Sequence, residues 1–108
     1  MVSAMAKGPG WEMRADIPAE ILAGVPTAIR FFLVDRAGQP VVADGVDFFA
    51  YRPSDASQDF SLAMTDEGKG RYLAEVTFPL IGIWDTLIAI KSGAQEYNLG
   101  KRVSVQRP

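Results

Sequence analysis

Two alternating segments joined by a short bend constrain what this chain can fold into more than any other feature of the sequence. They span residues 70–78 and 82–91, and each opens with a Gly-x-aromatic pattern, which ends at Tyr72 in the first and at Trp84 in the second. Apolar side chains recur at every second position in both segments, which is the period of a half-buried β-strand. The sequence therefore predicts two adjacent strands, with Tyr72 and Trp84 as core residues.

The same alternation recurs along the rest of the chain, between turns rich in Gly, Pro and Asp. It predicts five further strands, at residues 11–16, 25–35, 46–52, 60–64 and 97–105. Residues 17–24 fit a helical turn or an irregular edge segment, and the breakers at both of their ends favour the edge segment. About seven short strands without long helical patterns predict an all-β fold, an immunoglobulin-like antiparallel β-sandwich, with a seven-stranded barrel as the main competitor.

The length of 108 residues is typical of one domain, which we place at residues 10–108. Residues 1–9 run into a breaker cluster and are expected to be a flexible lead-in or the edge of a piece cut from a longer protein. The hydrophobic content of 48% and the charged content of 22% are those of a soluble globular protein. No segment has the length and apolar composition of a membrane span or a signal peptide.

The chain contains neither histidine nor cysteine. This composition excludes Ser-His-Asp triads, Cys-His pairs and His-based zinc or copper sites. The net charge of −2, with no run of Lys or Arg, argues against a nucleic-acid partner. We therefore expect a protein that is not an enzyme, with no catalytic residues.

Acidic residues and methionines are the remaining candidates for chemistry, and both favour structural interpretations. Asp44 and Asp47 fall in a turn and on a strand face, where solvated carboxylates are the rule, and no Asp-x-Asp-x-Asp calcium loop occurs. Met13 and Met64 offer thioether ligands for Cu(I), but isolated methionines in apolar strand patterns are more often core residues. No metal site and no cofactor are predicted.

Large apolar side chains on the second face of two predicted strands form the candidate interaction surface. Phe32 lies opposite Phe31 in the pleat, and Phe49 and Tyr51 lie opposite Phe48. Such side chains are either covered by a neighbouring element or exposed as a patch, and exposed apolar patches mark interaction surfaces. If Phe32 and Phe49 share a face, that face is our choice for a partner contact or a homodimer contact.

Several short motifs follow one another over nearly the whole chain from Gly8 onward. They are Gly10-Trp11, Asp35-x-x-Gly38-x-Pro40, Val46, Arg52-Pro53, Gly70-x-Tyr72-x-Ala74, Gly82-x-Trp84-Asp85 and Arg102-Val103-Ser104-Val105. In order and spacing this set resembles the extracytoplasmic domain of the FixH family, also called CcoH, and the related YtkA-like domains.

The resemblance implies an immunoglobulin-like domain outside the cytoplasm, on a protein anchored at the periplasmic face of the inner membrane by an N-terminal helix that this sequence lacks. It implies a non-catalytic part in assembling cbb-type cytochrome oxidase, in microaerobic respiration and nitrogen fixation. The expected partners are membrane-bound oxidase or copper-transporting ATPase assembly components, bound by protein-protein contacts. The alternative is a generic immunoglobulin-like binding or adhesion module of a surface protein, for which Tyr51 and Tyr97 are the candidate carbohydrate contacts.

Overall fold

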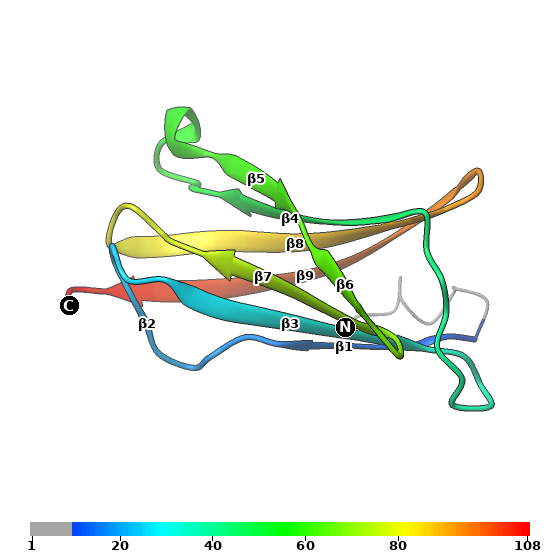
Figure 1. Ribbon diagram of the computed structural model, residues 1–108. Coiled ribbons are helices and arrows are strands. Elements are labelled where there is room, and N and C mark those ends of the chain that lie inside the picture. The colour runs from blue at the N-terminus through cyan, green and yellow to red at the C-terminus, as the bar shows by residue number, and fades with distance from the viewer. Residues whose placement is uncertain (1–9) are drawn as a thin grey trace.

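The computed structural model describes residues 10–108, which form two β-sheets packed face to face (Figure 1). The expected lead-in at residues 1–9 lies outside the described residues. The elements in chain order are β1 (Glu12–Asp16), β2 (Ile21–Leu22), β3 (Thr27–Val34), β4 (Gly45–Tyr51), the 3-10 helix η1 (Ala56–Gln58), β5 (Phe60–Ala63), β6 (Thr65–Gly68), β7 (Arg71–Val76), β8 (Gly82–Ser92) and β9 (Gln95–Gln106). The prediction of an all-β sandwich is confirmed.

The four-stranded sheet, sheet A, has the order β1-β3-β7-β6, and the five-stranded sheet, sheet B, has the order β2-β9-β8-β4-β5. Neighbouring strands are antiparallel, except that β2 runs parallel to β9. The chain passes from sheet B to sheet A between β5 and β6, and Figure 1 shows these two short strands almost end to end. The hairpin of β8 and β9 forms the longest pairing in the sandwich.

The structure adds two short strands to those that the alternation predicts. The ambiguous segment 17–24 contains β2, whose two residues are too few to show a period. The residues before Gly70, expected to form a turn, contain β6. All four residues of β6 are exposed, and its pairing with β7 shifts register between Asp66 and Gly68, so no apolar alternation marks it.

The core lies between the sheets, where the inward side chains of β3, β4, β7 and β8 meet. The structure buries both residues expected there: Trp84 is 0% exposed and Tyr72 is 4% exposed. Met64 is buried in the same core and Met13 packs partly against it, as the structural interpretation of the methionines expects. The largest fully buried side chains are Trp84, Phe31, Phe48, Phe78, Ile21, Ile29, Leu33, Ile88, Ile90 and Val76.

Trp84 is the centre of an aromatic cluster at one end of this core. Its ring centroid lies 5.4 Å from that of Phe78 and 5.7 Å from that of Phe60, in edge-to-face arrangements. Such pairs stabilise a core beyond the area that they bury. The cluster joins β8 of sheet B to the residues that follow β7 of sheet A, so it ties the two sheets together.

Gly70 holds the turn from β6 to β7 against β3. Its φ is +78°, and its carbonyl oxygen accepts a hydrogen bond from the Leu33 N–H at 2.8 Å. A Cβ atom at this position would collide with the Leu33 carbonyl. Glycine is therefore required here by both backbone conformation and space.

Candidate functional site

The three residues of the candidate interaction surface lie on opposite outer faces of the sandwich. Phe32 is on β3 and points outward from sheet A, whereas Phe49 and Tyr51 are on β4 and point outward from sheet B. Phe32 and Phe49 therefore do not share a face, and the condition for a single patch is not met.

Phe32 is surrounded by arginines that the strand register brings together. Arg14 of β1 and Arg71 of β7 are the residues paired with Phe32 on its two neighbouring strands. The Arg14 guanidinium carbon lies 4.6 Å from the centre of the Phe32 ring, which is a cation–π contact. We call this surface the Phe32 patch, and its residues are Glu12, Arg14, Arg30, Phe32, Val34, Glu67 and Arg71.

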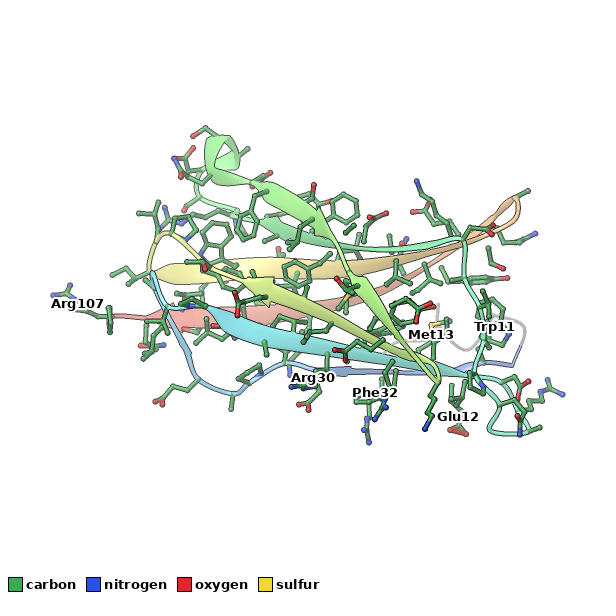
Figure 2. The ribbon with its side chains drawn as sticks, viewed as in Figure 1. Trp11, Glu12, Met13, Arg30, Phe32 and Arg107 are labelled. Carbon is green, nitrogen blue, oxygen red and sulfur yellow. The ribbon has the colours of Figure 1, made fainter. Side chains whose placement is uncertain are left out.

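Arg30 completes the patch two residues before Phe32 on the same strand. Its guanidinium lies 4.0 Å from the Glu67 carboxylate of β6, at the edge of ion-pair distance. The Arg30 side chain is 49% exposed and the Glu67 side chain 39%, so solvent screens the pair and it adds little to stability. Figure 2 shows Phe32 and Arg30 pointing away from sheet B, toward the outside of the sandwich.

Two hollows open on this face and meet at the Phe32 ring. The larger, of about 500 Å³, is lined by Glu12, Met13, Arg14, Phe32 and Val34. The smaller, of about 140 Å³, is lined by Arg30, Phe32, Glu67, Arg71 and Tyr72. Aromatic residues, phenylalanine included, and arginine are enriched at protein interfaces. The Phe32 patch can therefore receive apolar and acidic side chains of a partner.

The outer face of sheet B carries a smaller apolar strip. The Phe49 and Tyr51 rings stack in parallel, with centroids 6.1 Å apart and an interplanar angle of 2°. Leu87 of β8 is paired with Phe49 on one side and with Gly100 of β9 on the other. Because Gly100 has no side chain, the strip is open on the β9 side. Tyr51 is 40% exposed.

The candidate carbohydrate contacts do not come together. Tyr51 points outward from sheet B, whereas Tyr97 packs against the core and makes an edge-to-face contact with Trp11 at 5.3 Å. The two phenols lie on opposite faces of the sheet and cannot line one groove.

A further group of exposed apolar residues, which alternation does not mark, lies in the loop between β7 and β8 and at the start of β8. Leu80, Ile81 and Ile83 are between 37% and 47% exposed. Arg52, from the loop after β4, donates a hydrogen bond to the Ile81 carbonyl oxygen at 2.6 Å and lies 5.9 Å from the Trp84 ring centre. Arg52 thus joins two loops and covers the end of the aromatic cluster.

The shifted pKa values of this domain have local structural causes. Hydrogen bonds from Arg102 at 2.7 and 3.2 Å, and then its charge, lower the pKa of Asp85. Hydrogen bonds from the Ser57 hydroxyl and backbone lower the pKa of Asp55. Burial raises the pKa of Tyr72, which lies under the Phe32 patch. Each residue with a shifted pKa lies in a turn, in an ion pair or in the core.

Residues 10–108 contain no group of three or more His, Cys, Asp or Glu side chains placed to hold a metal ion. In the same part of the chain, no helix has the length and apolar composition needed to cross a bilayer.

Solved structures define the class of the fold. The Lin-41 filamin domain superposes with a TM-score of 0.65 at 16% sequence identity, covering 92% of this chain and 94% of that domain. Part of the endo-β-1,4-mannanase from Thermotoga petrophila superposes with a TM-score of 0.63 at 8% identity, covering 90% of this chain and 20% of that one. At these identities the likeness shows the fold alone. The chain is an immunoglobulin-like β-sandwich domain, as the sequence predicts.

The family follows from the sequence itself. The pattern of the FixH family matches residues 3–104, which is nearly the whole chain. The chain belongs to the FixH family, and the resemblance drawn from its motifs is confirmed. Among proteins with curated descriptions, none matches the chain.

Proposed function

We propose that this chain is a non-catalytic accessory domain that takes part in the assembly of cbb-type cytochrome oxidase by binding other proteins. The observation that carries the proposal is the FixH family match over residues 3–104. The proposed partners are membrane-bound components of the oxidase or of the copper-transporting ATPase. The proposed location is the periplasmic face of the inner membrane, with the domain attached to a membrane helix.

The Phe32 patch is the surface that we propose for this contact. It combines a half-buried ring, three arginines at outward positions and two adjoining hollows. Arginine forms bidentate hydrogen bonds with carboxylates, and the hollows on both sides of the ring leave room for apolar side chains. A partner segment with acidic and apolar residues fits this chemistry. On sheet B, a hollow of about 370 Å³ lies beside the strip and is lined by Arg52, Pro53, Ser54, Gly82, Ile83 and Arg102, but not by the stacked rings of Phe49 and Tyr51.

Co-purification of the natural full-length protein with oxidase and copper-ATPase subunits from detergent-solubilised membranes tests both parts of the proposal. The parent protein is expected to retain these subunits, and Phe32→Ala is expected to reduce their recovery several-fold. Phe49→Ala is the matched control, because it removes the same ring from the other outer face and is expected to leave recovery unchanged.

The possible results of this experiment test the proposed assembly role and the proposed contact surface separately. Failure of the parent to retain any of these subunits would contradict the assembly role. Equal recovery with Phe32→Ala and with the parent would contradict the choice of the Phe32 patch. A loss of recovery with Phe49→Ala alone would move the contact to sheet B.

A further inference from the structure

Among the four edge strands that residues 10–108 form, β5 alone lacks the features that discourage pairing with another strand. β1 carries three charged side chains, β6 carries two acidic side chains and a register shift, and β2 has only two residues. β5 reads Phe60-Ser61-Leu62-Ala63, without a charge, a proline or a register shift. Charges, bulges and very short strands are the devices by which proteins protect sheet edges. Figure 1 shows β5 at the margin of sheet B.

The open edge of β5 presents the backbone groups of two residues. The Met64 N–H donates to the Val46 carbonyl oxygen at 2.8 Å, so the backbone groups at this position point toward β4. The direction of N–H and C=O groups alternates along a strand, which turns those of Ser61 and Ala63 away from β4. Both residues have small, exposed side chains, so nothing on the strand itself shields these groups.

We propose that β5 pairs with β5 of a second copy of this chain, antiparallel and about a two-fold axis at Leu62. Directly opposed residues of an antiparallel pair point to the same face of the sheet. This axis places Ser61 opposite Ala63 of the second copy, and the symmetry repeats that pair. Each pair can exchange both of its N–H···O hydrogen bonds, because these are the residues whose backbone groups point to the open edge.

The sequence of β5 is compatible with pairing to an identical strand, which favours a second copy of this chain as the pairing partner. In this pairing, Ser61 lies opposite Ala63 of the second copy on the outer face, and Leu62 lies opposite Leu62 of the second copy on the inner face. No like charges face each other. Self-pairing of β1 about Arg14 would instead oppose two arginines, and Glu12 to Asp16, which is destabilising. Each chain contributes one open β5 edge, so the pairing closes after two copies.

The dimer is expected to be weak. Pairing of two four-residue strands buries less than the roughly 1,200 Å² at the low end of stable interfaces. Sedimentation equilibrium of the 108-residue chain from about 20 μM to about 1 mM covers the range in which such an association appears. The weight-average mass is expected to rise from 11.7 kDa at the lowest concentration toward twice that value at the highest.

Charge variants at the two exposed positions test the register. Ser61→Lys combined with Ala63→Lys places like charges opposite each other and is expected to keep the mass at that of the monomer. Ser61→Lys combined with Ala63→Glu places opposite charges in register and is expected to restore association. Thr77→Lys combined with Ser104→Lys adds the same charge at exposed positions away from β5 and is expected to associate like the parent.

Hydrogen exchange supplies an independent measurement on the parent protein. The amides of Ser61 and Ala63 are expected to exchange several-fold more slowly at the highest concentration than at the lowest, because pairing protects them. A parent that stays monomeric throughout overturns the proposal. So does association of the double-lysine variant equal to that of the parent, or a failure of the lysine–glutamate variant to associate.

Discussion

The indole N–H of Trp84 donates a hydrogen bond to the backbone oxygen of Leu80 at 3.0 Å. This bond satisfies the single polar atom of a fully buried side chain. It also attaches the loop between β7 and β8 to the aromatic cluster, so the loop that links the two sheets is held by the core residue that follows it.

The first prediction concerns this tryptophan. Trp84→Ala is expected to lower the free energy of unfolding by about 3–5 kcal/mol, because it leaves a large cavity between the sheets. Trp84→Phe keeps most of the aromatic packing but loses the hydrogen bond to Leu80, and is expected to cost about 1–3 kcal/mol. Urea unfolding followed by circular dichroism gives both values. A loss below about 1 kcal/mol for the alanine variant would mean that Trp84 does not hold the core.

The second prediction compares two consecutive phenylalanines that undergo the same chemical change. Phe31 is fully buried between the sheets, and Phe31→Ala is expected to cost about 3–5 kcal/mol. Phe32 points outward against Arg14, and Phe32→Ala is expected to cost only about 1–2 kcal/mol. Denaturant midpoints for the two variants measure the difference. Equal losses would show that the outer face of sheet A is as enclosed as the core.

The third prediction compares two glycines of the same turn. Gly68 and Gly70 both have a φ near +80°, but a Cβ at Gly68 would meet open space, whereas one at Gly70 would collide with the Leu33 carbonyl. Gly68→Ala is expected to cost about 1–2 kcal/mol from backbone strain alone. Gly70→Ala is expected to cost at least about 1 kcal/mol more, because β3 must move away. Thermal unfolding in parallel tests this order, and a reversed order would contradict the packing of this turn on β3.

The fourth prediction concerns acid. The hydrogen bonds and charge of Arg102 hold the folded-state pKa of Asp85 below its unfolded value, which is about 3.9. The ion pair therefore contributes stability that is present above the unfolded pKa and is lost as the pH falls through the folded pKa. An NMR titration of the side-chain carboxyl carbons is expected to show that Arg102→Gln raises the pKa of Asp85 toward its ordinary value.

Asp55 is the internal control for that titration. Hydrogen bonds from Ser57 lower its pKa, so Arg102→Gln is expected to leave its titration midpoint unchanged. If the midpoint of Asp85 does not move in the variant, the pairing with Arg102 does not persist in solution.

The fold could be predicted wherever the alternation of apolar and polar residues along a strand shows which of its faces is buried. Period-two alternation places Tyr72 and Trp84 inward, because one face of each strand is buried and the other is not. β6 escaped prediction, since its residues are all exposed and only its pairing with β7 defines it as a strand. β2 escaped it because two residues carry no period.

The candidate site could be predicted only in part. Alternation correctly puts Phe32 and Phe49 on the outward faces of their strands, yet it does not say which sheet each strand joins. The surroundings of Phe32 depend on register: Arg14 contacts its ring, and Arg71 lies at the neighbouring position, only because β1 and β7 both pair with β3 in these alignments. Such long-range pairing leaves no signal in any single segment.

The most direct measurement of the central claim, that this domain binds its assembly partners through the outer face of sheet A, is site-specific photocrosslinking in cells that make cbb-type oxidase. A photoreactive residue replaces Phe32 in one variant and Phe49 in another, and the adducts are identified by mass spectrometry. The account predicts adducts with oxidase or copper-ATPase subunits from position 32 and a much lower yield from position 49. Adducts from position 49 alone, or none of these subunits from either position, would contradict it.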